Sequence, residues 1–566
     1  MNGEIRISKL ESRKEVVREV RLSATLNISV YRRFVSVSIQ VSLVQSSRPY
    51  CWKKMKLGVA ELSNSELWIY FFGWATGLFY GLYQIYLQTS AYFDNYDNKL
   101  ELAPGWGWIG RRLDIADVES LVFMPLIYES FPWICVHFLG GQMIKYFFNT
   151  SLLCCWFVFI SLTYQLFYFG LPTVIFLLVM PFVTCILVPF RSKILLWTVQ
   201  LSVLLLFGVF GKIEDSWRNL LAVNWQQYYI VVVVFAWNQL RSLSFGLDSI
   251  DKYKHVKING FCKDLLEILA FCLYLPTYFL GQMILFEEFV EGIRRPFEAW
   301  TLNKTARTVF DFLRFFFWIK MSEFILHYVY ITALRNHIEL IRGLDNWACY
   351  PFGFWMGLHF FTKYVVFYGI SSVIPRAENI VDLPTPRCIA RIHLYSDMWK
   401  YFDRGLYKFL VRYIYLPSGG AKSALQKFVS SILCFSFIYM WHGIARFIFI
   451  WSALNWAGVT IESVAKGIAS SKTYVRIEEK YLGPKNTRRF RCLLASPLFI
   501  MSAISNFYFF GGEEVGYHFI DRILHDSWKS IMILIFFVYC LCQVSTEFEN
   551  RDIRKCQRFK SVDKSN

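Results

Sequence analysis

The chain has 566 residues, of which 55% are hydrophobic, 19% are aromatic and only 18% are charged. A soluble domain carries roughly a quarter charged residues, and the apolar residues here gather in runs of about 20, the length that crosses a bilayer of roughly 30 Å. A soluble enzyme, a disordered protein and a disulfide scaffold are therefore disfavoured. The net charge of +18 leaves three explanations, namely nucleic acid, anionic lipid, or loops on the cytosolic face of a membrane.

Residues 1–60 are predicted to form a basic, poorly ordered N-terminal extension. Residues 1–58 contain 12 lysines or arginines against 4 acidic residues. This stretch has neither a long basic run nor a recognisable nucleic-acid-binding fold, so no nucleic-acid partner is expected. Two adjacent arginines interrupt any apolar signal region, which argues against a cleaved signal peptide. Met55 precedes the first convincing span, and residues 1–54 are interpreted as a dispensable extension or the product of an upstream start.

From Leu67 onward, apolar runs of spanning length follow one another. They predict an all-α, polytopic membrane protein with roughly 10–12 transmembrane or re-entrant helices. The expected spans, some of them short, are 67–87, 121–147, 151–170, 172–190, 194–210, 228–237, 265–286, 308–333, 350–374, 429–464, 492–510 and 527–544. The membrane domain is thus expected over residues 61–545, with a polar C-terminal tail at 546–566.

Two basic loops constrain the topology. Residues 375–427 contain 9 lysines or arginines against 4 acidic residues, and residues 472–491 contain 7 against 2. The positive-inside bias places both loops on the cytosolic face, which a single crossing between them cannot satisfy. Residues 429–464 therefore cross twice or form a re-entrant hairpin, or else some basic residues lie in the headgroup region. The sequence leaves these alternatives open.

Of the nine histidines, His442 is the most prominent candidate, because it lies inside a strongly apolar segment. Ionisable groups within membrane spans are costly and are functional candidates by default. His137, His327 and His359 compete with it, and any one such histidine is more often a hydrogen-bonded packing residue. Upstream, Asp403 is followed directly by an arginine in a segment dense in aromatic residues. Taken alone, that pair is equally well an ordinary interfacial ion pair.

The segment around Asp403 has a distinctive pattern. It matches the string WxxFDxGLxxFLxRYxYxPxGG at Trp399, Phe402, Asp403, Gly405, Leu406, Phe409, Leu410, Arg412, Tyr413, Tyr415, Pro417, Gly419 and Gly420. His442 follows Asp403 by 39 residues, and both stand in a background of many spans. From about residue 66 to about residue 544 the chain resembles the membrane-bound O-acyltransferase superfamily, and within it the protein-cysteine N-palmitoyltransferases that acylate Hedgehog ligands.

The resemblance implies a fold, an activity and a location. The fold would be the multi-span fold of that superfamily. The activity would be transfer of palmitate from palmitoyl-coenzyme A to the N-terminal cysteine amine of secreted signalling proteins, with Hedgehog-type and also EGF-like ligands as substrates. The expected location is the endoplasmic reticulum membrane, crossed several times, with the Golgi as a second candidate. The oligomeric state is not indicated.

The resemblance also implies two catalytic residues. His442 would take a proton from the attacking amine or stabilise the tetrahedral intermediate, a role worth roughly 10²- to 10⁴-fold in rate. An α-amino group with a pKa near about 8 is partly neutral at pH 7, so the imidazole need only collect a proton as the bond forms. Asp403 would orient the imidazole or the substrate amine, and its contact with His442 is a hypothesis because only the fold can bring the two together.

Substrate-binding roles are expected nearby. Lys400, Arg404 and Arg412 are candidates to hold the head of coenzyme A on the cytosolic side, with ordinary interfacial cations as the strong alternative. Trp399 and Asn506 would line the substrate tunnel, by resemblance alone.

One of the 14 cysteines has a second interpretation. Many of them lie in apolar runs without CxxC pairs or metal-ligand spacing, so reduced, membrane-buried thiols and no metal site are expected. By resemblance, Cys388 would be the thiolate ligand of a haem at the cytosolic edge, whereas by composition it is one free thiol among many.

Two other functions compete. In the first, an enzyme of the same superfamily acylates a lysophospholipid or sterol hydroxyl, a weaker nucleophile that would depend more on His442 as base. In the second, the chain is a non-catalytic transporter or scaffold. Midplane polar residues suit a transporter, but no paired internal repeat is visible. Membrane lipid is an expected partner in each case.

Overall fold

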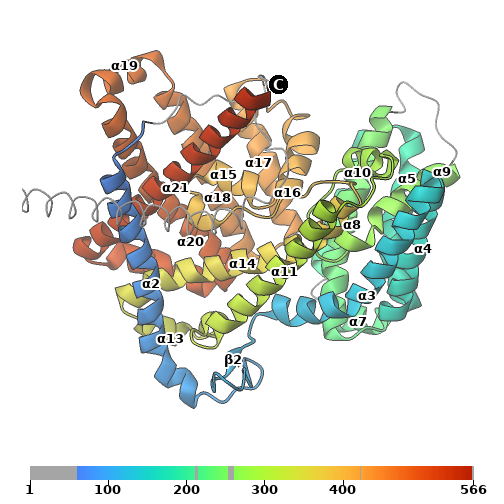
Figure 1. Cartoon of the computed structure of the whole chain (residues 1–566), viewed down its shortest axis with the longest axis horizontal. Coiled ribbons are helices and arrows are strands. Elements are labelled where there is room, and N and C mark those ends of the chain that lie inside the picture. The colour runs from blue at the N-terminus through green and yellow to red at the C-terminus, as the bar shows by residue number, and fades with distance from the viewer. Residues whose placement is uncertain (1–59, 211–213, 253–260, 421, 564–566) are drawn as a thin grey trace, which may run out of the picture. The chain divides into compact units, whose positions relative to one another are not determined.

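The computed structural model describes residues 60–210, 214–252, 261–420 and 422–563 (Figure 1). The predicted extension up to residue 59 and the proposed start at Met55 lie outside these ranges. The described part is helical apart from its loops and one antiparallel pair, β1 (Leu102–Ala103) and β2 (Leu113–Asp114). The prediction of an all-α, polytopic membrane protein is confirmed.

Eight helices in the described ranges are long and apolar enough to cross a membrane. They are α3 (Val118–Phe147), α4 (Thr150–Phe169), α5 (Leu171–Leu187) continued by η1 (Val188–Phe190), α8 (Trp225–Lys252), α17 (Ala424–Trp441), α18 (Arg446–Ala469), α20 (Gly483–His525) and α21 (Trp528–Asp563). Three more long helices are α2 (Asn64–Asn95), α11 (Leu302–Leu326) and α14 (Asn346–Ala377). α2 and α14 cover the predicted spans 67–87 and 350–374, whereas α11 covers the predicted span 308–333 only as far as residue 326. The expected start of the polar tail at residue 546 lies inside α21.

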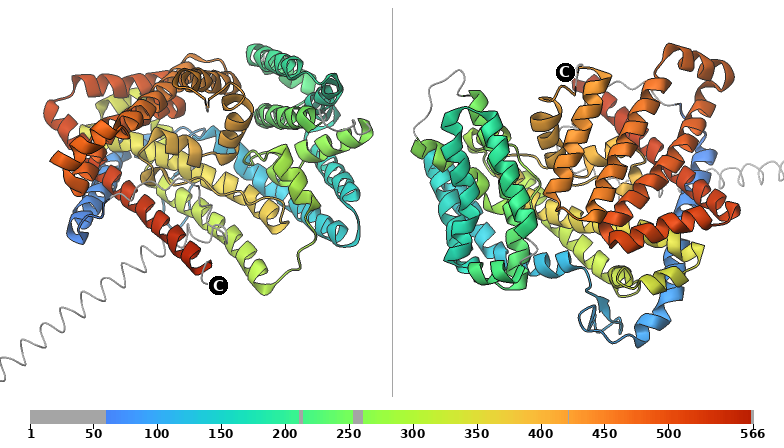
Figure 2. Two further views of the ribbon diagram at one scale, coloured as in Figure 1. Left: turned by 90° about the horizontal axis from the view of Figure 1, so that it is seen from above. Right: turned by 180° about the vertical axis from the view of Figure 1, so that it is seen from behind.

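Shorter helices connect these elements. They are α6 (Lys193–Phe210), α7 (Glu214–Leu221), α12 (Ile331–Leu334), α13 (Ile338–Gly343), η4 (Ile389–Arg391), α15 (Tyr395–Tyr401), α16 (Arg404–Leu410), the π-helical η5 (Val411–Tyr415) and α19 (Lys472–Tyr481). In the views of Figure 2, α3 to α6 pack on one another in chain order, and α17, α18 and α20 form a second group, with α14 packed against α20.

One predicted span, 265–286, is not a continuous helix. It is divided into α9 (Phe261–Cys272), η3 (Leu275–Thr277) and α10 (Phe286–Arg294), with irregular backbone between them. Pro276 lacks a backbone N–H and so cannot donate to the carbonyl group of Cys272, the last residue of α9, which favours the end of the helix there.

The irregular backbone between α9 and α10 is held from two sides. From α8, the fully buried guanidinium of Arg241 donates to the carbonyl groups of Cys272 and Thr277, which satisfies groups that the end of α9 leaves free. From α16, Gly405 approaches so closely that a Cβ atom there would lie 2.1 Å from the carbonyl oxygen of Met283. The segment is therefore enclosed in protein, where irregular backbone is tolerated at membrane depth.

The stretch 429–464 is a helical hairpin made of α17 and α18. α17 and α18 pack against each other and are joined by the turn at residues 442–445. The chain thus returns to the side on which α17 begins. A double crossing of 429–464 would have this hairpin geometry and would place the basic loops 375–427 and 472–491 on one face, in agreement with the positive-inside bias.

Candidate active site

Asp403 stands at the N-cap of α16 and is held by two hydrogen bonds. Its Oδ1 accepts the backbone N–H of Leu406 at 2.8 Å, and its Oδ2 accepts the hydroxyl of Tyr368, from α14, at 2.9 Å. A short acidic side chain is favoured at an N-cap because it satisfies an N–H group that the start of a helix leaves free. The half-buried carboxylate therefore has one defined orientation.

His442 ends α17 and begins the turn toward α18. Gly443, which follows it, has a φ of +103°, a conformation that glycine adopts without strain. The imidazole centroid lies 4.7 Å from the ring of Trp441, 5.1 Å from Trp451 and 5.3 Å from Phe509, with the rings edge to face. Within the described part of the chain no hydrogen bond reaches the His442 side chain, so both of its ring nitrogens are available to a substrate.

Aromatic rings connect the two turns. Phe402, next to Asp403, stacks on Phe360 of α14 at 5.7 Å, and Phe360 lies 5.9 Å from Phe509, the ring that contacts His442. Among the described residues, no hydrogen bond or ion pair joins Asp403 to His442. The hypothesised direct contact is therefore not made among the described residues, and each carboxylate oxygen, with one hydrogen bond, can still accept another.

Trp399 and Asn506 meet His442 at a shared neighbour, Trp451. The Trp399 ring lies 5.6 Å from that of Trp451 and its Nε1 donates to Asn455 at 3.1 Å. The Nε1 of Trp451 donates to the side-chain oxygen of Asn506 at 3.3 Å. Three residues chosen from the sequence thus converge on Trp451 of α18, which was not among the residues selected from the sequence.

Arg412 is paired with acidic residues. Its guanidinium contacts Asp248 of α8 at 2.9 Å and Glu287 of α10 at 2.5 Å, and the Tyr413 hydroxyl also donates to Asp248. These contacts fasten η5 to α8 and α10. They favour the interfacial-cation interpretation of Arg412 over a role in holding coenzyme A.

Three cations gather around the ring of Tyr401. Arg387, Lys400 and Arg404 lie 4.3, 4.8 and 5.3 Å from its centroid. Two of them were selected from the sequence, whereas Arg387 and Tyr401 were missed as binding residues. The signal in the sequence that could have identified Arg387 is its position next to Cys388. Such a cluster suits the phosphates of a coenzyme head group.

Cys388 precedes η4 as a free, half-buried thiol. Burial raises the pKa of this thiol, so a bound metal would be needed to hold it as the thiolate. Arg387 and Arg391 flank it, both paired with Asp552 of α21 at 3.2 Å, and the guanidinium of Arg391 lies over Phe548. The chemistry at this position is one sulfur donor, two guanidiniums that share one carboxylate and an aromatic face, a donor set compatible with a thiolate-ligated haem.

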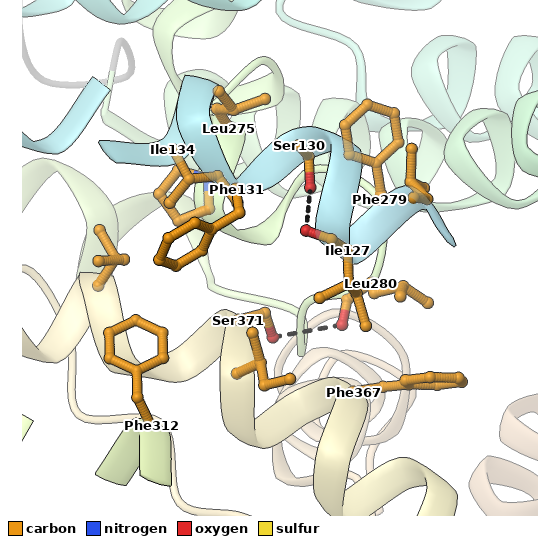
Figure 3. Close-up of a pocket in the computed structure, with 14 residues that line it drawn as sticks. Ile127, Ser130, Phe131, Ile134, Leu275, Phe279, Leu280, Phe312, Phe367 and Ser371 are labelled. Carbon is orange, nitrogen blue, oxygen red and sulfur yellow. Dashed lines mark hydrogen bonds between the residues drawn. The ribbon is translucent and has the colours of Figure 1, made fainter. Parts of the chain in front are cut away.

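An apolar pocket lies between α3, η3, α11 and α14 (Figure 3). Its only hydroxyl groups, those of Ser130 and Ser371, donate to backbone carbonyl groups, so the lining suits a hydrocarbon chain. None of the residues selected from the sequence lines this pocket. Phe367 and Ser371 nevertheless place it beside Tyr368 on α14.

The chain is similar to known membrane enzymes over most of its length. Residues 182–505, which include Asp403 and His442, match the family model of MBOAT, the membrane-bound O-acyltransferase family. The protein-cysteine N-palmitoyltransferase Rasp of Drosophila melanogaster is 29% identical over 497 residues, 86% of this chain and 95% of the relative. The protein-cysteine N-palmitoyltransferase HHAT of Mus musculus is 25% identical over 483 residues, covering 82% and 94%. The membrane-bound O-acyltransferase gup1 of Schizosaccharomyces pombe is 24% identical over 427 residues, covering 66% and 70%.

Proposed function

The chain belongs to the membrane-bound O-acyltransferase family, and from this premise we propose that it transfers palmitate from palmitoyl-coenzyme A to the N-terminal cysteine amine of secreted signalling proteins. Two relatives named protein-cysteine N-palmitoyltransferases, each matched over more than 80% of this chain, support that donor and acceptor. The proposed acceptors are Hedgehog-type and EGF-like ligands. The proposed location is the endoplasmic reticulum membrane, with the Golgi second.

The environment of His442 carries the proposal. A general base must have a free nitrogen within reach of the reacting atoms, and the His442 ring is held by aromatic packing alone. The ring is partly exposed, so a substrate can approach it.

The proton movements balance with His442 as the only shuttle. The neutral amine attacks the thioester carbonyl, the C–N bond forms, and His442 takes a proton from the nitrogen. When the C–S bond breaks, the protonated imidazole returns that proton to the sulfur of coenzyme A. The products are a palmitoyl amide and a free thiol, and His442 is restored.

Binding roles are proposed for the surrounding residues. Asp403, whose carboxylate has one orientation, receives the N–H groups of the incoming amine. Lys400 and Arg404, which lie beside the ring of Tyr401, face the phosphates of coenzyme A. Trp399 and Asn506, which both contact Trp451, border the path of the acyl chain.

Haem binding at Cys388 is part of the proposal. The Cys388 sulfur would ligate the iron, and Arg387 and Arg391 would face the propionates. When bound, the haem supplies an iron–thiolate bond that ties this loop to its cofactor, and no step of acyl transfer requires it. We expect a Soret band in the purified protein that Cys388→Ala abolishes, whereas a wild-type protein that shows no band after haem loading contradicts this part of the proposal.

A second acceptor class is supported by the similarity to gup1, which is named an O-acyltransferase without a protein substrate. A lipid hydroxyl would use the same histidine as base. The test offers labelled palmitoyl-coenzyme A to purified enzyme together with either a Cys-initiated peptide or a lysophospholipid. We expect label on the peptide and its loss in both His442→Ala and Asp403→Ala. Label on the lipid alone favours the second class, and wild-type rates in both variants would place the site elsewhere.

A further inference from the structure

Tyr368 is the one side chain from outside the Asp403 segment that bonds to the Asp403 carboxylate among the described residues. It lies on α14, 35 positions before Asp403, and is 5% exposed. Its hydroxyl donates to Oδ2 at 2.9 Å. Neither the motif nor the similarity to known enzymes assigns it a role.

The two hydrogen bonds on Asp403 act at different oxygens. The backbone N–H of Leu406 fixes Oδ1, and the Tyr368 hydroxyl fixes Oδ2. One bond alone leaves the carboxylate free to turn about its Cβ–Cγ axis, because that terminal torsion is broad. With both bonds made, the plane of the carboxylate is set by two separate elements, α16 and α14.

Tyr368 is itself held rigidly. Its ring packs edge to face against Tyr364 at 5.2 Å, and the Tyr364 hydroxyl donates to Glu119 at 3.2 Å. One residue earlier on α14, the ammonium group of Lys363 bonds to Asp117 at 2.9 Å and to Glu119 at 2.6 Å. These contacts tie α14 to the first turn of α3, so the Tyr368 hydroxyl cannot follow Asp403 if the carboxylate moves.

We propose that Tyr368 is a positioning residue for acyl transfer, and that its hydroxyl holds the Asp403 carboxylate in the orientation that receives the acceptor's reacting group. The inference rests on the proposed function, because it assigns Asp403 to that reaction. Tyr368 acts through Asp403 and does not touch the reacting atoms. Its removal should therefore change turnover rather than donor binding.

The test compares Tyr368→Phe, which removes a single oxygen, with a matched control. Tyr278→Phe is that control, because Tyr278 is equally buried and its hydroxyl donates to Gln165 at 2.7 Å, outside the site. Steady-state rates are measured by release of the coenzyme A thiol. For Tyr368→Phe we expect kcat to fall about tenfold to hundredfold, the usual effect of losing a hydrogen bond to a charged group, with an unchanged KM for palmitoyl-coenzyme A. The control should keep the wild-type kcat.

A double-mutant cycle separates positioning from a structural effect. In an Asp403→Asn background, which no longer offers a carboxylate to be oriented, Tyr368→Phe should cause little further loss. If Tyr368→Phe lowers thermal stability, 4-aminophenylalanine at position 368 supplies a donor in the same place and should restore kcat. Wild-type kcat in Tyr368→Phe, an equal loss in the Asp403→Asn background, or no rescue by the amino variant would each overturn the inference.

The same assay distinguishes this inference from the proposed function. Thiol release is followed with the Cys-initiated peptide and, in parallel, with a lysophospholipid. If the wild-type enzyme turns over the lipid but not the peptide, the proposed acceptor is contradicted. The kcat values of Tyr368→Phe and its controls are then measured with the lipid as acceptor. Normal wild-type turnover with the peptide, unaffected by Tyr368→Phe, contradicts the role of Tyr368 alone.

Discussion

The Asp403 turn and the His442 turn hold their ionisable groups in opposite ways. Asp403 begins a short helix, and each of its carboxylate oxygens accepts a hydrogen bond. His442 ends a long helix, and its ring is confined by three aromatic neighbours without a hydrogen bond. Hydrogen bonds fix the direction in which the Asp403 carboxylate points. Ring contacts restrict the plane of the His442 imidazole and leave its nitrogens without partners among the described residues. The carboxylate is thus oriented without a substrate, and in the proposed reaction the imidazole would receive its partner from the substrate.

Each turn also depends on a glycine, for a different reason. Gly405 permits a close approach of α16 to the backbone at Met283. Gly443 supplies a positive φ in a turn where an added Cβ would meet nothing within 4 Å. A side chain at position 405 is therefore excluded by crowding, whereas a side chain at position 443 is disfavoured by the backbone conformation.

Removal of the imidazole should have the largest effect. His442→Ala is expected to lower kcat about 10²- to 10⁴-fold, since the general base is lost. His525→Ala is the matched control, because that histidine is 76% exposed beside Asp521 at the end of α20. Comparable losses in both variants would remove His442 from the reaction.

Gly405→Ala should be the next most damaging change. Its methyl group would overlap backbone at Met283, which cannot rotate away, so we expect a loss of about 1–3 kcal/mol in stability. The melting temperature in detergent should fall, and kcat should fall with it because Asp403 moves. An unchanged melting temperature would show that α16 and the irregular segment do not pack as described.

Gly443→Ala should cost less. The penalty is conformational only, about 1–2 kcal/mol for a side chain at positive φ. Because the strain lies next to His442, kcat should fall while the KM for palmitoyl-coenzyme A stays constant. If Gly443→Ala lost more stability than Gly405→Ala, the account of crowding at Gly405 and backbone strain at Gly443 would be wrong.

Arg412→Gln should have the smallest effect. Its ion pairs with Asp248 and Glu287 are partly exposed, so their loss should cost about 1 kcal/mol or less. We expect an unchanged KM for palmitoyl-coenzyme A, in contrast to Lys400→Gln, which should raise that KM. A raised KM for palmitoyl-coenzyme A in Arg412→Gln would show that Arg412 does contribute to binding coenzyme A.

The sequence predicted the features that local patterns encode. Apolar runs located the long helices, and the motif with the apolar segment that follows it located Asp403 and His442. Charge asymmetry argued against a simple single crossing between the basic loops and left a double crossing, a re-entrant hairpin or headgroup-level basic residues. Pro276 was visible as well, but it stands in an apolar run of spanning length, and hydropathy alone did not reveal the break. The enclosing contacts of Arg241 and Gly405 come from segments distant in the chain.

The sequence could not predict contacts between distant segments. Tyr368 is separated from Asp403 by 35 residues, and Arg412 from Asp248 by 164, so no spacing rule connects them. Phe360 is one aromatic residue among many in the chain, and only the packing of α14 against α20 identifies it as the ring between the two turns.

The most direct measurement uses two peptides that differ only at the N-terminus. Purified enzyme is given labelled palmitoyl-coenzyme A and a Cys-initiated peptide, either with a free amine or N-acetylated, and the product is treated with hydroxylamine to remove thioesters. The account predicts label that resists hydroxylamine on the free peptide and none on the acetylated one. Equal label on both peptides, or label lost to hydroxylamine, would contradict amide formation at the N-terminal cysteine.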